Sequence, residues 1–224
     1  MPKHSVILHE LTQKEYTAWL ESGDLVGALI PVGSVENHYE HLALIHDTAS
    51  AAHIAREAAL RVYPHVVVTP PMAVGLSAGW KDMRGTLTLR EDVLAEVVFD
   101  YCNSIVTHHG LKNVLIVNGH LGNHKPIADR MDEFREKLRA NIAIVTYWDL
   151  VDKDKTESIM ETKRYPAHAQ EYETSIAMAG FPQHVRRDAI VNEQAIPSAA
   201  EKGKVFIADA VEGIVAILCG WTTG

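Results

Sequence analysis

Short apolar runs alternate along the chain with longer segments in which apolar residues recur at the spacing of a helix. The runs are rich in β-branched residues and predict buried strands that begin near Leu25, His65, Asn113 and Asn141. The helical patterns lie at residues 47–63, at about 90–109, after Asn123 and at 209–218. Strands that alternate with helices form parallel sheets, because a parallel connection needs a crossover long enough for a helix. We therefore expect an α/β fold, a three-layer α/β/α sandwich with a mostly parallel central sheet.

Neither repeats nor linkers interrupt this pattern, so we expect one domain over residues 1–224. Hydrophobic residues make up 47% of the chain and charged residues 22%, which is typical of a globular domain and excludes a disordered or coiled-coil protein. Asp and Glu number 29 against 21 Lys and Arg, which gives a net charge of -8. An acidic chain without a basic run is not expected to bind nucleic acid or an anionic membrane.

The N-terminal segment and the cysteines bear on localisation. Residues 1–16 contain a short apolar patch and then become polar, so they lack the long apolar core of a secretory signal. No apolar stretch has the length needed to span a bilayer. Cys102 and Cys219 are too few for a disulfide framework or a four-sulfur zinc site. We expect a cytoplasmic protein.

Histidine is frequent, with 13 residues, and many of these histidines lie near carboxylates just after predicted strands. In open parallel sheets, ligands gather at the carboxyl ends of the strands. Three segments carry the candidates: Glu36, His38, Glu40, His41, His46 and Asp47 after the first strand, His120 and His124 after the run from Asn113, and later His168, Glu171 and Glu173.

The first of these segments predicts a metal site. Glu36 and His38 are two residues apart, which places both side chains on the same side of an extended segment. Asp47 opens the next helix, where a carboxylate also complements the helix dipole. Imidazole and carboxylate together suit zinc or manganese. The alternative for each residue alone is ordinary: Asp47 as a helix N-cap, His38 as a polar loop residue, and His120 as part of a glycine-bounded turn.

Two ions about 3.5–4 Å apart, with a shared carboxylate and a shared water, would use about five ligands from these segments. Such ions make hydroxide available near neutral pH and polarise a carbonyl, which is hydrolytic chemistry. The chain has no Walker loop, and neither cysteine lies in the sequence context of a nucleophile.

From about Leu25 to Ala177 the motifs resemble, in order, those of the creatininase (creatinine amidohydrolase) family of metal-dependent amidases. The first family signature is matched by Gly33, Ser34, Glu36, His38, His41, Leu42 and Asp47. The later signatures are matched by Gly85 and Thr86, by Asn118, Gly119, His120 and Asn123, by Tyr147, Trp148 and Asp149, and by His168, Glu173, Thr174 and Ser175.

The resemblance implies which residues hold metal. Glu36, Asp47 and His120 would hold one ion, and His38 with the bridging Asp47 would hold the other. The implied cofactors are two divalent metal ions, zinc first, with manganese or iron at one site as the alternatives.

The resemblance also implies the remaining ligand and the proton carrier. Creatininase proper has a glutamate two residues after the signature histidine, where this chain has Gly122. Relatives with glycine there take a carboxylate from the Glu-Thr-Ser signature, which implies Glu173, with Glu171 as the alternative. His168 would be the catalytic proton shuttle, which takes a proton from water and gives it to the leaving nitrogen.

Several positions around the expected pocket depart from the family pattern. Tyr39 replaces a glycine after the signature histidine, and Trp80 lies where the family commonly has other residues. These departures argue against creatinine as the substrate. Arg84 or Lys81 would anchor a substrate carboxylate, or else be a surface charge. The candidate substrate-binding residues are Ser77, Trp80 and Trp148.

The leading hypothesis from the sequence is a dinuclear metal-dependent amidohydrolase, in which a metal-bound hydroxide cleaves the C–N bond of a small cyclic or linear amide. The alternatives are a deformylase or small peptidase of the same family, or a catalytically silent metal- or ligand-binding protein. The expected partners are a small-molecule amide substrate and, by resemblance to a family with many hexamers, further copies of the chain in a homo-oligomer.

Overall fold

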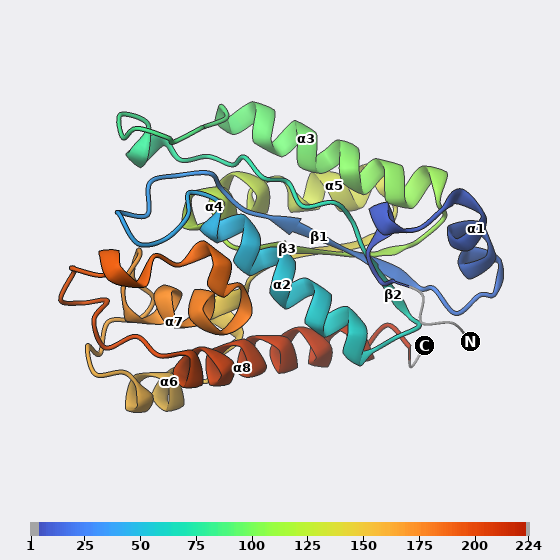
Figure 1. Cartoon of the computed structure of the whole chain (residues 1–224). Coiled ribbons are helices and arrows are strands. Elements are labelled where there is room, and N and C mark those ends of the chain that lie inside the picture. The colour runs from blue at the N-terminus through green and yellow to red at the C-terminus, as the bar shows by residue number, and fades with distance from the viewer. Residues whose placement is uncertain (1–4, 223–224) are drawn as a thin grey trace.

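A sheet of four parallel strands forms the centre of the computed structural model, which describes residues 5–222 (Figure 1). The strands are β1 (Gly27–Val32), β2 (Val66–Val68), β3 (Asn113–Asn118) and β4 (Asn141–Thr146), in the spatial order β2-β1-β3-β4. All residues of β1 and β2 are buried, as expected for a parallel sheet that is covered on both faces. The predicted α/β fold is confirmed.

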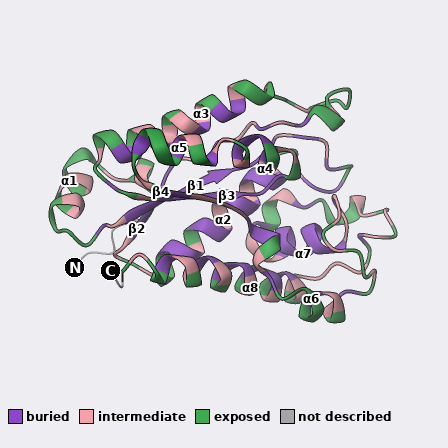
Figure 2. Ribbon diagram, turned by 180° about the vertical axis from the view of Figure 1, so that it is seen from behind, coloured by how far each residue is buried: buried purple, intermediate pink, exposed green. Residues whose placement is uncertain are grey.

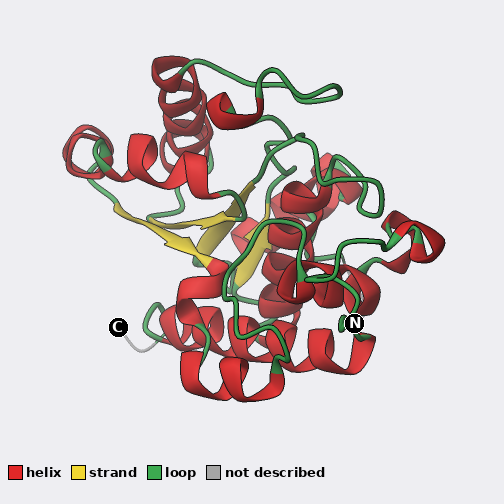
Figure 3. Cartoon of the chain, turned by 90° about the vertical axis from the view of Figure 1, so that its left-hand side faces the viewer, coloured by secondary structure: helices red, strands yellow, loops and turns green. Residues whose placement is uncertain are grey.

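Helices cover both faces of this sheet and complete the three layers (Figure 3). One face carries α2 (His46–Arg61), α7 (Glu171–Gly180) and α8 (Ala200–Cys219), and the other carries α3 (Glu91–Asn103), α4 (Leu121–Ala128) and α5 (Met131–Leu138). Successive residues of a strand point to opposite faces. Leu29 accordingly packs into the core on the α2 side, with Phe206, and Ile30 into the core on the α3 side, with Phe134. Figure 2 shows the strands buried between these layers.

The remaining helical segments lie around the three layers. They are α1 (Gln13–Glu21), α6 (Lys153–Ile159), a π-helix (Ser104–His108) and short 3-10 helices at Leu8–Glu10, Ala78–Trp80, Tyr147–Leu150, Pro182–His184 and Arg187–Ala189. Across residues 5–222, no helix combines the length and apolar character that crossing a membrane requires.

Several helices differ from the sequence expectation. The helix expected after Asn123 is two short helices, α4 and α5, and α4 contains Pro126, which has no N–H to donate within the helix. The closing helix α8 begins nine residues earlier than Asp209, because α8 lies against α7 over its N-terminal half. That close approach requires Gly203, since a Cβ there would lie 1.9 Å from the carbonyl oxygen of Ser175.

The segment before Glu173 also differs, and this difference matters for the site. Glu171 could replace Glu173 only on an extended segment, whereas both residues lie in the first turn of α7. On a helix, residues two apart point in directions that differ by about 200°. The two carboxylates therefore cannot serve the same site.

Candidate metal centre

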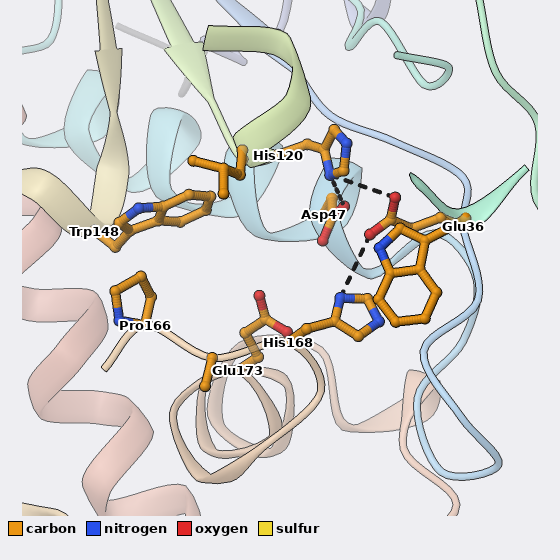
Figure 4. Close-up of a pocket in the computed structure, with 11 residues that line it drawn as sticks. Glu36, Asp47, His120, Trp148, Pro166, His168 and Glu173 are labelled. Atoms are coloured by element: carbon orange, nitrogen blue, oxygen red, sulfur yellow. Dashed lines mark ion pairs between the residues drawn. The ribbon is translucent and has the colours of Figure 1, made fainter. Parts of the chain in front are cut away.

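Acidic and imidazole side chains from several parts of the chain meet where β1 and β3 end (Figure 4). Glu36 and His38 lie on the segment between β1 and α2, and Asp47 lies in the first turn of α2. His120 follows β3 directly, and Glu173 comes from the first turn of α7. The convergence follows from the topology, because β1 and β3 are adjacent and parallel, so their carboxyl ends lie at the same edge.

Asp47 lies at the centre of this group. Its Oδ1 is 3.0 Å from Nε2 of His38, and its Oδ2 is 2.9 Å from Nδ1 of His120. The carboxylate is almost fully buried, with a side-chain exposure of 4%. One carboxylate therefore faces two imidazoles through its two oxygens, which is the arrangement of a ligand that bridges two ions.

Further carboxylates surround the two imidazoles. Oε2 of Glu36 lies 3.5 Å from Nδ1 of His120, and Oε1 of Glu36 lies 3.4 Å from Nδ1 of His168. Glu173 lies 3.8 Å from Nε2 of His38. Three overlapping groups have one ligand atom per residue within 4.8 Å of one another: Glu36, Asp47 and His120; His38, His46, Asp47 and Glu173; Glu36, His38 and His168.

Backbone carbonyls fix the orientation of three histidines in this group. Each ring donates one N–H to a carbonyl oxygen and turns its other nitrogen toward the carboxylates. The bonds are His38 Nδ1 to Glu36 O (3.1 Å), His120 Nε2 to Leu76 O (2.9 Å) and His168 Nε2 to Asn37 O (2.8 Å). Metal-ligating histidines use their second nitrogen in this way.

Two of the central atoms lack ordinary hydrogen bonds. Nε2 of His38 and Oδ2 of Asp47 are buried and make no hydrogen bond of acceptable geometry with any residue in the range 5–222. An unsatisfied buried polar atom costs about 1–3 kcal/mol. A cation between these atoms would satisfy both, so the donor set fits divalent ions of the kind that accept imidazole and carboxylate ligands.

The charges of the group depend on one another. Burial lowers the pKa of His38, but the charge and hydrogen bonding of Asp47, together with the charge of Glu173 and the carbonyl of Glu36, outweigh burial and raise this pKa to about 9. Burial raises the pKa of Asp47, yet His38 and His120 together hold it below its usual value. Burial, followed by repulsion from Asp47, raises the pKa of Glu36. In the metal-free protein, protons on the imidazoles therefore balance the buried carboxylates.

Metal binding should release protons, because an ion must displace the proton that His38 holds with a pKa of about 9. At pH 7.5 we expect release of about one proton or more per chain, and the apparent metal affinity should fall up to about tenfold for each pH unit below 9 on account of that proton. Isothermal titration in two buffers of different ionisation enthalpy measures the release. A metal affinity that is independent of pH, with no proton released, would contradict this charge assignment.

The structure separates the two candidate glutamates. Glu173 faces the pocket, and burial raises the pKa of its carboxyl group to about 7. Glu171 is fully buried elsewhere and accepts hydrogen bonds from Nζ of Lys202 (2.6 Å) and from the backbone N–H groups of Glu161 (3.0 Å) and Thr162 (2.8 Å). Glu171 therefore anchors the segment before His168 and is not available to the metal group.

A small cavity of about 160 Å³ opens beside the metal group. The Trp80 ring stacks on His168, with ring centroids 4.2 Å apart and an interplanar angle of 22°. Trp148 and Pro166 lie on the side of the pocket away from Glu36 and His168 (Figure 4), and Leu121 adds to the apolar lining. Drug-sized ligands occupy about 300–1,000 Å³, so this cavity suits a much smaller molecule.

Three expected substrate contacts lie outside this cavity. Ser77 is buried and its hydroxyl is hydrogen-bonded to that of Ser34, which lies 3.4 Å from the Glu36 carboxylate. Ser77 therefore supports a metal ligand and does not line the pocket. Lys81 and Arg84 are exposed and do not line it either.

Some of the residues that build the site carried no role in the sequence analysis. The side chain of Asn123 donates to the carbonyl of Gly33 (2.9 Å) and accepts from the N–H of Leu76 (2.8 Å), so it ties together two loops that hold the histidines. Its place in the Asn-Gly-His-x-x-Asn signature was the available signal. Leu121 and Pro166 line the pocket, and neither has a chemical signature in sequence.

Comparison with known proteins places this geometry in a family. The family model described as creatinine amidohydrolase matches residues 9–216. The creatinine amidohydrolase of Pseudomonas putida is 28% identical over 207 residues, which covers 84% of this chain and 76% of the relative. A mycofactocin precursor peptide peptidase of Mycobacterium ulcerans is 25% identical over 230 residues, covering 88% and 86%. A solved mutant creatininase of the zinc–zinc type superposes with a TM-score of 0.87 at 23% identity, covering 99% of this chain and 100% of that chain.

Proposed function

The chain belongs to the creatininase (creatinine amidohydrolase) family of metal-dependent amidohydrolases, and from this premise we propose that it binds two divalent ions and cleaves the C–N bond of a small, uncharged amide. The observation that carries the proposal is the position of Asp47, whose two oxygens lie 3.0 and 2.9 Å from nitrogens of two different histidines. A residue that only capped a helix would have no reason to be buried between two imidazoles.

Each ion would have its own ligands and share Asp47. The first ion would be held by Glu36, Asp47 and His120, which lie within 4.8 Å of one another. The second would be held by His38, Asp47 and Glu173, with zinc as the expected metal at both sites and manganese or iron as the alternatives at one of them. When bound, such ions lower the pKa of water and polarise a carbonyl oxygen.

His168 is placed to move the proton. Its Nε2–H donates to the carbonyl of Asn37, so Nδ1 carries the lone pair and faces the carboxylate of Glu36 at 3.4 Å. Burial lowers the pKa of His168 to about 4, so the ring is neutral near pH 7 and its Nδ1 lone pair is free. Stacking against Trp80 fixes the plane of the ring. His168 would take a proton from the attacking water and pass it to the leaving nitrogen.

The pocket favours a small and uncharged substrate. The volume of about 160 Å³ leaves room for few non-hydrogen atoms beside the metal group. Within the described part of the chain, no Lys or Arg side chain lines this cavity, so nothing there would neutralise a substrate carboxylate. Trp148, Leu121 and Pro166 instead offer an apolar surface to the part of the substrate that does not react.

A deformylase or small peptidase is the second candidate. It is favoured by the similarity to the mycofactocin precursor peptide peptidase and by Leu121, which is 75% exposed at the pocket and would contact a longer substrate. A third candidate is a protein that binds metal or ligand without turnover.

Hydrolysis of a compound panel by the zinc-loaded protein distinguishes these candidates. The panel contains cyclic amides, linear primary amides, N-formyl compounds and short peptides, each with and without a carboxylate. We expect turnover of a small neutral amide, loss of turnover after treatment with a chelator, and recovery when zinc or manganese is added back. Preferential hydrolysis of formyl compounds or peptides would support the second candidate. Two bound ions without hydrolysis of any compound would contradict the proposed activity.

A further inference from the structure

We propose that His46 is a direct ligand of the second ion, so that this ion is held by two imidazoles and two carboxylates. The inference rests on the proposed two-ion function and assigns a ligand beyond it. His46 is the first residue of α2 and immediately precedes Asp47. The complete set on the second ion would be His38, His46, Asp47 and Glu173.

The burial of His46 without a full set of partners is the first observation. The residue is 1% exposed, and its Nδ1 makes no hydrogen bond with any residue that the structure describes. The ring packs between His38 and Phe181, with ring centroids 4.9 and 5.7 Å away. Leaving a buried polar atom unpaired costs about 1–3 kcal/mol, whereas phenylalanine or leucine would fill this space without that cost. Nε2 of His46 lies 3.4 Å from the hydroxyl of Ser50, so Nδ1 is the nitrogen that needs a partner.

The position of His46 relative to the ligands is the second observation. One ligand atom from each of His38, His46, Asp47 and Glu173 lies within 4.8 Å of the others. Four nitrogen and oxygen donors at about 2.0–2.1 Å would complete a tetrahedral zinc site and lie about 3.4 Å from one another. Movement of the side-chain atoms by at most about 1.4 Å would bring the group to that geometry.

Position 122 supplies no ligand to the second ion. A Cβ at this position would lie 2.1 Å from the carbonyl oxygen of Leu76 and 2.7 Å from Nε2 of His120, so no side chain can reach the ion from there. Without His46, the second ion would have only the three protein ligands of the proposed site. His46 approaches from the α2 side and supplies the fourth.

A supporting role through His38 is the competing explanation. If the ring of His46 only packed against His38, its loss would lower the affinity for the second ion by about 10–100-fold. That is the usual effect of removing a residue that supports a metal ligand. Loss of a direct ligand should exceed about 100-fold and change the coordination of the ion itself. These two magnitudes, together with a spectrum of the ion, separate the explanations.

The test compares the wild type with His46→Gln and His46→Leu, and uses His41→Gln as the matched control. His41 is also 1% exposed and near the site, but its Nε2 is hydrogen-bonded to the hydroxyl of Thr174 (3.0 Å), and it belongs to none of the ligand groups. Stepwise zinc dissociation constants come from competition with a chelator. The visible spectrum added by the second equivalent of Co²⁺ reports the coordination of the second ion.

We expect the wild type and His41→Gln to bind two ions per chain. The visible spectra added by the first and second equivalents of Co²⁺ should be the same in both proteins. Both His46 variants should keep the first ion at unchanged affinity, which also shows that they are folded. Their second dissociation constant should rise more than about 100-fold, with a changed second cobalt spectrum.

Other results would overturn the inference. If both His46 variants kept the affinity for the second ion and its cobalt spectrum, His46 would not be a ligand. The proposed two-ion function would stand. A weakening of less than about 100-fold with an unchanged spectrum would assign His46 to support of His38. A wild type that binds one ion or none would remove the two-ion function and the inference together.

Discussion

Replacing Asp47 with asparagine should weaken the binding of both ions by more than about 100-fold each and lower kcat/KM by at least about 10³-fold. The reason is geometric, because the two carboxylate oxygens face different histidines at 3.0 and 2.9 Å. Asparagine keeps the shape of the side chain but removes its negative charge and turns one oxygen into an amide nitrogen that cannot bind a cation. Zinc content after dialysis and turnover of the best panel substrate measure the two effects.

Asp92→Asn is the matched control for this variant. Asp92 also lies in the first turn of a helix, α3, but its side chain is 76% exposed and its one ion pair, with Arg90, is at the surface. A carboxylate whose only role is to complement the helix dipole contributes about 0.3–1 kcal/mol to stability. The control should therefore keep both ions and full activity. If Asp47→Asn also kept two ions and its turnover, Asp47 would be a helix-capping residue and the proposed site would be wrong.

Replacing His168 with alanine should lower kcat by about 10²–10⁴-fold while both ions stay bound. His168 lies at the pocket edge with its Nδ1 facing Glu36 at 3.4 Å, and no other uncommitted base occupies that position among the residues lining the described cavity. Added imidazole should restore part of the activity, because the cavity left beside Trp80 has the size of the missing ring. Single-turnover kinetics and zinc analysis of the same sample separate the loss of chemistry from the loss of metal.

His124→Ala is the control for the second variant. His124 is a partly buried histidine whose Nδ1 is 2.8 Å from the hydroxyl of Thr146. It does not line the cavity and belongs to none of the ligand groups. This variant should retain its ions and its kcat. Loss of one ion from His168→Ala would instead identify His168 as a ligand, consistent with its proximity to Glu36 and His38, and would contradict its role as the proton carrier.

The layers of the fold and the edge that carries the site could be predicted from the sequence. Uninterrupted apolar runs such as Gly27–Val32 are typical of strands buried on both faces, and they alternate with helical patterns in only a few compatible ways. Because the carboxyl ends of parallel neighbours share an edge, the residues after β1 and β3 had to approach one another.

Helix boundaries were harder to predict, and the start of α7 determines which of two glutamates faces the metal group. Helix α1 was not predicted, although Thr12 and Glu15 form a capping box at its start. Glu171 was an alternative to the predicted ligand Glu173, because an extended segment would place both side chains on one side. The first turn of α7 separates them, and only packing against α8 and α2 makes this short segment a helix.

Other features of the site have no signal in sequence at all. The carbonyl groups of Asn37 and Leu76 orient His168 and His120, but any residue type could supply a carbonyl. Ser77 could be expected near the site from its position, but only the structure shows it behind Ser34 and away from the cavity. Tertiary contacts of this kind depend on the exact path of the loops.

Anomalous diffraction from a crystal of the zinc-loaded protein, recorded on both sides of the zinc absorption edge, locates the bound ions. We expect two zinc peaks about 3.5–4 Å apart, both within bonding distance of the Asp47 carboxylate. One should contact Glu36 and His120, and the other His38 and Glu173. A single peak, or peaks that Asp47 does not reach, would contradict a two-ion centre built on this carboxylate.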